Sequence, residues 1–440
     1  MRYENIKSGI LTILVLVSIL LTWNLWTYQP NYDFMDNGNT VAGVTVSEKQ
    51  EVRKIIKPDQ ILFHIKGGTY GTNNNGELER VIREMSRWTI YDVKNYTDKV
   101  GNIEDLSHGR GNIEVIFPGE VPIELYRSVL NIDEKKIPLF NFNKIIINVT
   151  GASKEYGTIY FVSIENQQVY SSHISAESLN GFNRSFYKNA AQYPRYFAYK
   201  ASERRTIFLP EEKIEMTPYK YFPNSLNSED FKEALFNDPS FVQKSTIAHI
   251  EEYTNDSSKM TINYDTNILR YVNPAAVDDY NEGSYDLVNR SIDFVNEHGG
   301  WTDPFRYVLK DDYKHSVTFR LYSMDGYPVF NDQGLSEIKE EWGQDEINSY
   351  VRPSIALDLP IPTDMKKVIR PSGHTVLEYL QSKKDFKPEL LDDLVLGYRM
   401  QRDTQENRLI LLEPAWFYRY DKSWKEITMK DLGGPAHGLE

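Results

Sequence analysis

Two stretches of this 440-residue sequence have residue types and spacings that nucleotide-binding proteins or zinc enzymes use. Gly67 to Gly76 is a glycine- and asparagine-rich loop between an expected strand and an expected helix, an arrangement that can cradle phosphate groups. It lacks the Gly-Lys-Ser/Thr ending that holds a nucleotide and Mg²⁺. His249 is followed by two glutamates but lacks the second histidine of a zinc protease motif. We therefore interpret the loop as a flexible turn and His249 as a surface helix residue.

The segment from Asp278 to Gly283 is similar to a calcium-binding loop. Tyr280 occupies one ligand position, however, and Asn289 stands at the twelfth position, where such loops have glutamate. We interpret the segment as a solvated acidic loop. The sequence has no Gly-x-Ser-x-Gly or Lys-Thr-Gly motif, which argues against familiar serine hydrolases and penicillin-binding enzymes. Carboxylates are so numerous that a glycan-cleaving pair stays open as a minor alternative.

An aromatic run from Glu413 to Tyr418 reads EPAWFY. Aromatic density of this kind is typical of binding faces, so Trp416 and Tyr418 are our candidates for surface interaction. A core strand with one exposed side explains the same pattern equally well, and both interpretations stay open.

Composition narrows the function class further. Hydrophobic residues make up 40% and charged residues 26%, and the 30 tyrosines, 20 phenylalanines and 7 tryptophans can fill several cores. The net charge of −13 disfavours contact with nucleic acid. The absence of cysteine excludes disulfides and thiolate metal sites. We expect no cofactor, no metal and no enzymatic activity.

Residues 9–28 are expected to form a transmembrane anchor. They lie within Ser8 to Tyr32, which carries no charge, and 19 residues of apolar helix span roughly 28 Å, close to the thickness of a bilayer core. Arg2 and Lys7 precede the span, and acidic residues follow it, so residues 1–8 should be cytoplasmic and the rest extracytoplasmic. The alternative is a cleaved signal peptide, but bulky residues follow the apolar core where small ones are needed.

The expected span carries small polar side chains, which let membrane helices approach closely and hydrogen-bond. Ser18 and Thr22 lie four residues apart and therefore share one face of the helix. Our candidates for contact with a partner helix are Thr12, Ser18, Thr22 and Asn24.

After the anchor, the periodicity predicts an α+β fold of three extracytoplasmic domains. The last two should be similar hairpin–helix–hairpin modules with antiparallel sheets. The expected segments are a tether at 29–60, an N-terminal α/β domain at 61–223, a central α+β module at 224–333 and a C-terminal α+β module at 334–440. The expected helices of the two modules run from Ser284 or Asp286 to Gly299, and from Gly373 to Lys383. The hairpins around them pair Met260–Tyr264 with Ile268–Val272, Phe305–Leu309 with Val317–Tyr322, Leu335–Trp342 with Ile347–Leu359, and Leu394–Gln401 with Leu409–Tyr420.

Several motifs in this order give the chain a family resemblance over essentially its whole length. The N-terminal stretch from Arg2 to Asp33 resembles that of the YycH (WalH) family of Gram-positive regulators. The further motifs are Gly326-Tyr327-Pro328-Val329-Phe330, Tyr350-Val351-Arg352-Pro353, Leu396-Gly397-Tyr398 and Leu412-Glu413-Pro414-Ala415-Trp416.

The resemblance implies an accessory protein at the plasma membrane that regulates the WalK–WalR (YycG–YycF) two-component system. The implied partners are the sensor kinase WalK and the sister protein YycI (WalI), contacted largely through membrane helices. A homodimer stays open. The resemblance also implies three domains, the last two alike, and carries over no catalytic residue. The alternative function is a wall-binding or structural assembly module.

Overall fold

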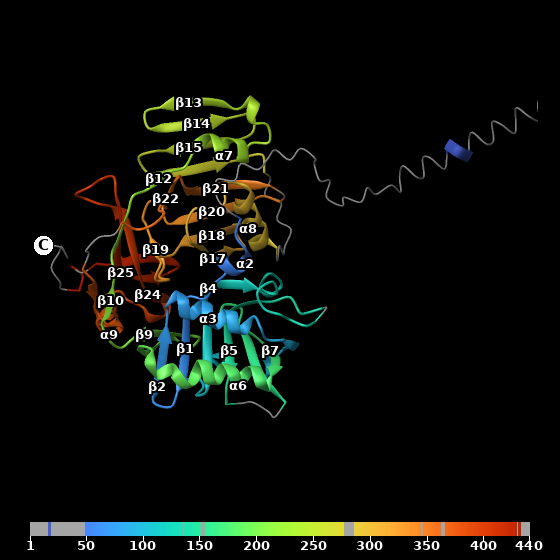
Figure 1. The fold of residues 1–440 in the computed structure, drawn as a ribbon, viewed down its shortest axis with the longest axis vertical. Coiled ribbons are helices and arrows are strands. Elements are labelled where there is room, and N and C mark those ends of the chain that lie inside the picture. Colours follow the sequence, from blue (N-terminus) through green and yellow to red (C-terminus); the bar gives the residue numbers. More distant parts are fainter. Residues whose placement is uncertain are drawn as a thin grey trace, which may run out of the picture. The chain divides into compact units, whose positions relative to one another are not determined.

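The computed structural model (Figure 1) describes residues 16–18, 49–134, 136–150, 155–276, 286–344, 346–361, 366–428 and 430–432. The chain divides into two units, Met1–Gly43 and Val44–Glu440. Residues 16–18 are helical, and the rest of the expected anchor at 9–28 lies outside the described residues. Across the described ranges, no helix is both long enough and apolar enough to cross a membrane.

A nine-stranded sheet is the first large layer of the second unit. Its strand order is β3-β7-β6-β5-β4-β1-β2-β8-β9, and every pairing is antiparallel. Antiparallel pairing belongs to the α+β class and corrects the α/β label that we gave to residues 61–223. The strands are β1 (Gln60–Ile65), β2 (Gly68–Thr72), β3 (Tyr91–Asn95), β4 (Asn112–Pro122), β5 (Asn141–Asn148), β6 (Tyr156–Ser163), β7 (Gln168–Ser175), β8 (Arg195–Ser202) and β9 (Arg205–Pro210).

The glycine-rich stretch is largely strand β2 and not the flexible turn that the sequence suggested. Gly71 allows β2 to lie close to its neighbours, since a Cβ there would be 2.7 Å from the Leu62 side chain. The helix that follows, α3 (Asn75–Met85), begins at Asn74, whose side chain accepts a hydrogen bond from Glu77 N at 3.2 Å.

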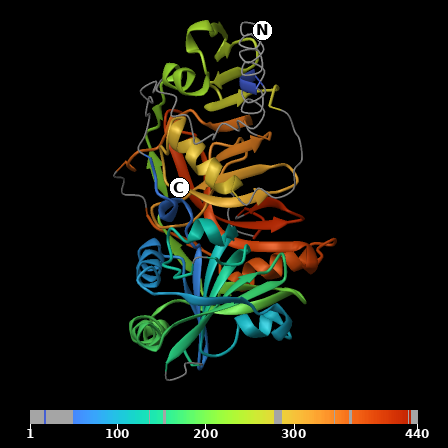
Figure 2. The ribbon, with the colours of Figure 1, turned by 90° about the vertical axis from the view of Figure 1, so that its right-hand side faces the viewer.

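Helices cover both faces of this sheet. Helices α3 and α6 (Ala176–Ser185) lie on the same side of it in Figure 2. The short helix α4 (Ile103–Ser107) packs against the other face, where Ile103 and Leu106 meet a separate cluster of buried side chains from β5, β6 and β7. The inward apolar residues of the two longer helices are Leu78, Val81 and Met85 in α3 and Leu179 and Phe182 in α6.

An eight-stranded antiparallel sheet forms the second layer. Its order is β13-β14-β15-β16-β21-β20-β18-β17. The strands are β13 (Gln243–Ile247), β14 (Ile250–Thr254), β15 (Lys259–Asn263), β16 (Ile268–Val272), β17 (Phe305–Asp311), β18 (Ser316–Leu321), β20 (Glu337–Trp342) and β21 (Ile347–Pro353).

Two helices pack on the eight-stranded sheet. Helix α8 (Leu287–Glu297) lies beside β18 (Figure 1) and ends before Gly299, whose φ of +104° favours glycine. Helix α7 (Ser228–Leu235) is capped by Asn227, whose side chain accepts a hydrogen bond from Glu229 N. His249 lies in the two-residue turn between β13 and β14, so its assignment to a surface helix is wrong.

A five-stranded sheet is built mainly from the C-terminal part of the chain. It contains β11 (Tyr219–Tyr221), β25 (Ile410–Tyr420), β24 (Leu391–Arg402), β19 (Val329–Phe330) and β26 (Ser423–Ile427), with only β19 and β24 parallel. Two small pairs join β10 (Ile214–Met216) to β23 (Val368–Arg370) and β12 (Asn224–Ser225) to β22 (Ile355–Ala356). The remaining helices are α2 (Val52–Ile55), α5 (Ile123–Tyr126), α9 (Gly373–Ser382), η1 (Thr97–Lys99), η2 (Tyr187–Gln192), η3 (Pro239–Phe241) and η4 (Pro388–Leu390).

Both expected hairpin–helix–hairpin units are present in order along the chain. The first consists of β15–β16, α8 and β17–β18, and the second of β20–β21, α9 and β24–β25. The four hairpins are divided unequally between sheets. β20–β21 lies in the same eight-stranded sheet as both hairpins of the first unit, while β24–β25 lies in the five-stranded sheet. The boundary expected between residues 333 and 334 therefore runs between strands of a single sheet.

Candidate functional site

Of the four residues expected to contact a partner helix, only Ser18 lies among the described residues. It is helical and exposed. Thr12, Thr22 and Asn24 lie outside the described residues, so this contact stays a prediction.

Trp416 and Tyr418 do not form an exposed face. Trp416 is only 2% exposed, and its Nε1 donates a hydrogen bond to the main-chain oxygen of Pro371 at 3.0 Å. Tyr418 is 7% exposed, and its hydroxyl accepts a hydrogen bond from Lys383 Nζ at 3.2 Å. The surface assignment is wrong because β25 is an interior strand that is buried on both faces over most of its length.

The nine-stranded and eight-stranded sheets meet along β4 and β17, and we call this meeting the β4–β17 contact. Tyr307 donates a hydrogen bond from its hydroxyl to the main-chain oxygen of Glu120 at 2.7 Å. Gly119 approaches the opposite backbone so closely that a Cβ would be 2.6 Å from the carbonyl oxygen of Val308. The contact thus combines a hydrogen bond from a tyrosine side chain with a close approach of two main chains, which leaves no room for a Cβ at residue 119.

Glu120 places a titratable carboxyl beside this contact. Its Oε1 accepts a hydrogen bond from the Ser163 hydroxyl at 2.9 Å, while Oε2 is buried with no hydrogen-bond partner among the described residues. Burial raises the pKa of Glu120 to about 7, against the opposing hydrogen bond from Ser163. A group with such a pKa changes charge near neutral pH, and the change occurs where two sheets touch.

Asp59 forms a second such site between the same two sheets. Its Oδ2 accepts a hydrogen bond from the Tyr322 hydroxyl at 2.8 Å. The guanidinium of Arg306 lies 4.2 Å from the centre of the Tyr322 ring and donates to Asn75 Oδ1 at 3.0 Å. Burial raises the pKa of Asp59 to about 6, although the charge of Arg306 opposes this rise. We regard Asp59, Glu120 and the β4–β17 contact together as the candidate functional site, because two buried carboxyls with raised pKa values lie where the two sheets meet.

A Gly119→Ala variant should weaken the β4–β17 contact. The added methyl group would collide with the backbone at Val308, which cannot move aside as a flexible side chain would. We expect the free energy of unfolding to fall by about 1–3 kcal/mol, as measured by chemical denaturation. Gly101→Ala is the matched control, since a Cβ at Gly101 has nothing within 4 Å. Equal effects of the two substitutions would contradict the tight approach.

A buried charge cluster occupies the outer face of the nine-stranded sheet, centred on Glu114. Glu114 is completely buried, and its oxygens lie 2.6 Å from His64 Nε2 and 2.9 Å from Lys144 Nζ. Burial alone would raise the pKa of Glu114, but Lys144 and His64 overcome it and hold the pKa well below its usual range. The carboxylate is ionised, paired and shielded from solvent. Because its partners lie on β1 and β5, it holds these two strands to β4.

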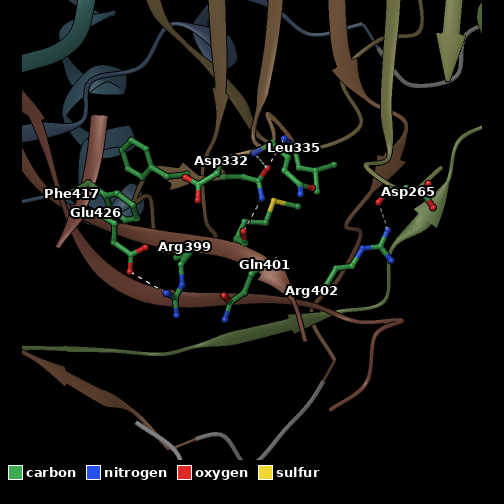
Figure 3. A pocket seen from close by; sticks show the side chains of 12 residues that line it. Asp265, Asp332, Leu335, Arg399, Gln401, Arg402, Phe417 and Glu426 are labelled. Carbon is green, nitrogen blue, oxygen red and sulfur yellow. Dashed lines mark hydrogen bonds and ion pairs between the residues drawn. The ribbon is translucent and has the colours of Figure 1, made fainter. Parts of the chain in front are cut away.

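A cleft of about 370 Å³ opens between the eight-stranded and five-stranded sheets (Figure 3). Arg399 on β24 points into it and is paired with Glu413 and, at 3.3 Å, with Glu426. Arg402 donates to the main-chain oxygen of Asp265 at 3.2 Å. Burial raises the pKa of Glu426, with Arg399 opposing. The charged groups of the cleft therefore mostly satisfy one another.

The remaining sequence motifs do not come together. His249 Nδ1 lies 2.8 Å from Asp265 Oδ1, at an exposed turn. The acidic stretch from Asp278 to Gly283 lies outside the described residues. Within the described ranges, no group of three or more His, Asp or Glu side chains is placed to hold a metal ion.

The fold and these contacts define an antiparallel α+β protein with buried carboxyl groups between its two largest sheets. Two family models match the chain in order: the YycH protein N-terminal domain over residues 4–191 and the YycH protein C-terminal domain over residues 204–433. The chain belongs to the YycH family.

One curated relative and one solved structure agree with this assignment. The relative is the two-component system WalR/WalK regulatory protein YycH of Bacillus subtilis (strain 168). It is 24% identical over an alignment 453 residues long, gaps included, that covers 98% of each chain. The crystal structure of YycH from Bacillus subtilis has a TM-score of 0.72 and 19% identity. The match covers 88% of this chain and 100% of that one. The α+β fold is thus shared with a solved family member.

Proposed function

We propose that this protein is a single-pass plasma-membrane regulator of the sensor histidine kinase WalK, acting together with YycI. The observation that carries the proposal is the family match along nearly the whole chain, starting at residue 4 and so including the expected anchor. The name of the Bacillus subtilis relative states a regulatory role in the WalR/WalK system. In this proposal the N-terminus is cytoplasmic and the acidic body is extracytoplasmic. The kinase system that the protein regulates controls cell-wall homeostasis.

The proposed mechanism is contact between membrane helices. The face that carries Ser18 and Thr22 packs beside the spans of the kinase and favours one of its two signalling arrangements. A preference of about 1–3 kcal/mol changes signalling by about 5–150-fold, so one helix–helix contact is sufficient. The extracytoplasmic body adds contacts with YycI and holds the anchor in place.

We further propose that the body binds partners and catalyses nothing. Glu114 and Glu340, two carboxyls with strongly shifted pKa values, are completely buried and so out of reach of a substrate. Glu114 also has a partner on each oxygen, His64 at one and Lys144 at the other, so it offers no free base to a substrate. Asp59 and Glu120 lie between the two largest sheets, where their protonation acts on sheet packing.

The helix-contact proposal predicts that a shortened chain of residues 1–35 keeps most of the effect on kinase output. Output would be measured with a reporter controlled by the response regulator, in cells lacking the full-length protein. The matched control is the body from residue 36 onward fused to an unrelated span, which should lose most of the effect. Full activity of that fusion would refute helix-specific coupling.

Photocrosslinking provides the direct test of the contact. A crosslinking residue at Ser18 or Thr22 should capture the kinase or YycI, whereas one at Leu20, on a different face of the same helix, should capture less. If neither Ser18 nor Thr22 captured a membrane partner, the helix-contact proposal would be refuted.

A further inference from the structure

Strand β13 (Gln243–Ile247) is a terminal strand of the eight-stranded sheet, and all five of its residues are exposed. It pairs with β14 through a two-residue turn, with Ile247 opposite Ile250 and Ser245 opposite Glu252. The apolar side chains Phe241 and Ile247 stand at its two ends, 76% and 67% exposed. Among the described residues, β13 pairs only with β14, so its outer side is available to a further strand.

The hydrogen-bonding groups on the open side belong to Lys244 and Thr246. Tyr264 N donates to the oxygen of His249 at 2.9 Å, so odd-numbered residues of β14 bond to β15 and even-numbered residues bond to β13. Their partners in β13 are residues 243, 245 and 247. The N–H and C=O groups of the two intervening residues must therefore point away from the sheet.

The other terminal strands of the two large sheets are protected in ways that β13 is not. Strands β3, β9 and β17 each have a register irregularity in their pairing, which twists an edge away, and β17 also lies against β4. The β13–β14 pairing is regular. The usual guard of an edge is an outward lysine, but Lys244 Nζ is held by Glu229 at 3.0 Å and Glu251 at 3.4 Å, over the sheet face.

We propose that β13 pairs antiparallel with β13 of a second copy of this chain, across a two-fold axis at Ser245. This register places Lys244 of each copy opposite Thr246 of the other, so both outward residues exchange their N–H···O=C bonds. It also avoids the lysine–lysine pair that a register centred on Lys244 would create. Two eight-stranded sheets then continue as one.

The same register accounts for the exposed apolar ends. Gln243 lies opposite Ile247 of the second copy, and Phe241, at the end of η3 just before the strand, lies at the same end of the paired strands as that Ile247. The two-fold axis repeats this contact at the other end. Since each chain has a net charge of −13, salt should strengthen the pairing by screening repulsion.

Disulfide formation tests the register directly, because the chain has no cysteine of its own. In the proposed pair, Ser245 faces Ser245 of the second copy at a non-hydrogen-bonded position, where the Cα atoms are about 4.5 Å apart and a disulfide fits. The full-length Ser245→Cys chain in mild detergent should form a covalent dimer at least about tenfold faster than Gln243→Cys, whose two copies would be roughly 14 Å apart along the strand.

A third variant separates pairing from chance collision. Adding Thr246→Pro to Ser245→Cys removes one outward N–H but leaves the β13–β14 ladder intact, since Thr246 donates nothing to β14. The covalent dimer should then disappear. Equal rates for Ser245→Cys and Gln243→Cys, no dimer from either, or a dimer unaffected by the proline would each overturn the proposal.

Discussion

Replacing Trp416 by alanine should lower the free energy of unfolding by about 3–5 kcal/mol. The indole is 2% exposed in β25, and removing it leaves a cavity that the interior strand cannot collapse to fill. The substitution also leaves the main-chain oxygen of Pro371 without its donor. Urea denaturation monitored by circular dichroism would measure the change as a shift of the midpoint.

Tyr313→Ala provides the comparison, because Tyr313 is 84% exposed. Its effect should stay within about 0.5 kcal/mol. If Trp416 were instead a surface contact residue, its replacement would leave the midpoint near that of the Tyr313 variant. The pair of variants therefore decides between a core role and a surface role for the aromatic run.

The aromatic run shows why sequence alone left this question open. Alternation reveals an exposed face only when one side of a strand meets water. In β25, Trp416 and Tyr418 point into the main core, while Ala415 and Phe417 pack with Phe330 and Trp424 on the other side. Because both faces are covered, the pattern carries no signal of which residues are accessible.

Elements whose cause is local were predictable. Helix α8 and the β15–β16 hairpin follow from apolar periodicity, a glycine after the helix and a short polar turn. Strands β13 and β14 were missed, because Gln243–Ile247 is exposed throughout and so lacks any apolar alternation. The sheet to which each strand belongs could not be predicted either, because β21 pairs with β16, some 80 residues earlier in the chain.

The candidate site had no sequence signal at all. Asp59 and Tyr322 lie 263 positions apart in the sequence, and Glu120 and Tyr307 lie 187 positions apart. No short sequence motif can connect residues at such distances. Each carboxyl looks like any other among the 63 acidic residues. Their distinction arises only from burial between two sheets, which depends on tertiary packing.

That burial makes stability dependent on pH, with a definite sign. The pKa of Asp59 rises from 3.8 to about 6, and that of Glu120 from 4.5 to about 7. A raised pKa means that the folded state prefers the protonated carboxyl. The stabilising contribution is therefore complete below the unfolded pKa, near pH 4, and is lost as pH rises through the folded pKa. Between pH 4 and 8 each group should lower the free energy of unfolding by about 3 kcal/mol.

Asp59→Asn and Glu120→Gln should remove these losses, since a neutral amide keeps the size of the side chain and an acceptor for Tyr322 or Ser163. Each variant should match the wild type near pH 4 and exceed its free energy of unfolding by about 3 kcal/mol at pH 8. Denaturation at several pH values gives the variant-minus-wild-type difference. Asp92→Asn is the control: Lys94 lowers the pKa of this half-buried carboxyl, so any contribution is lost only at low pH, outside the tested range. A difference that stayed constant from pH 4 to 8 for either variant would show that the replaced carboxyl does not titrate between the two sheets in this range, and its coupling to sheet packing would be refuted.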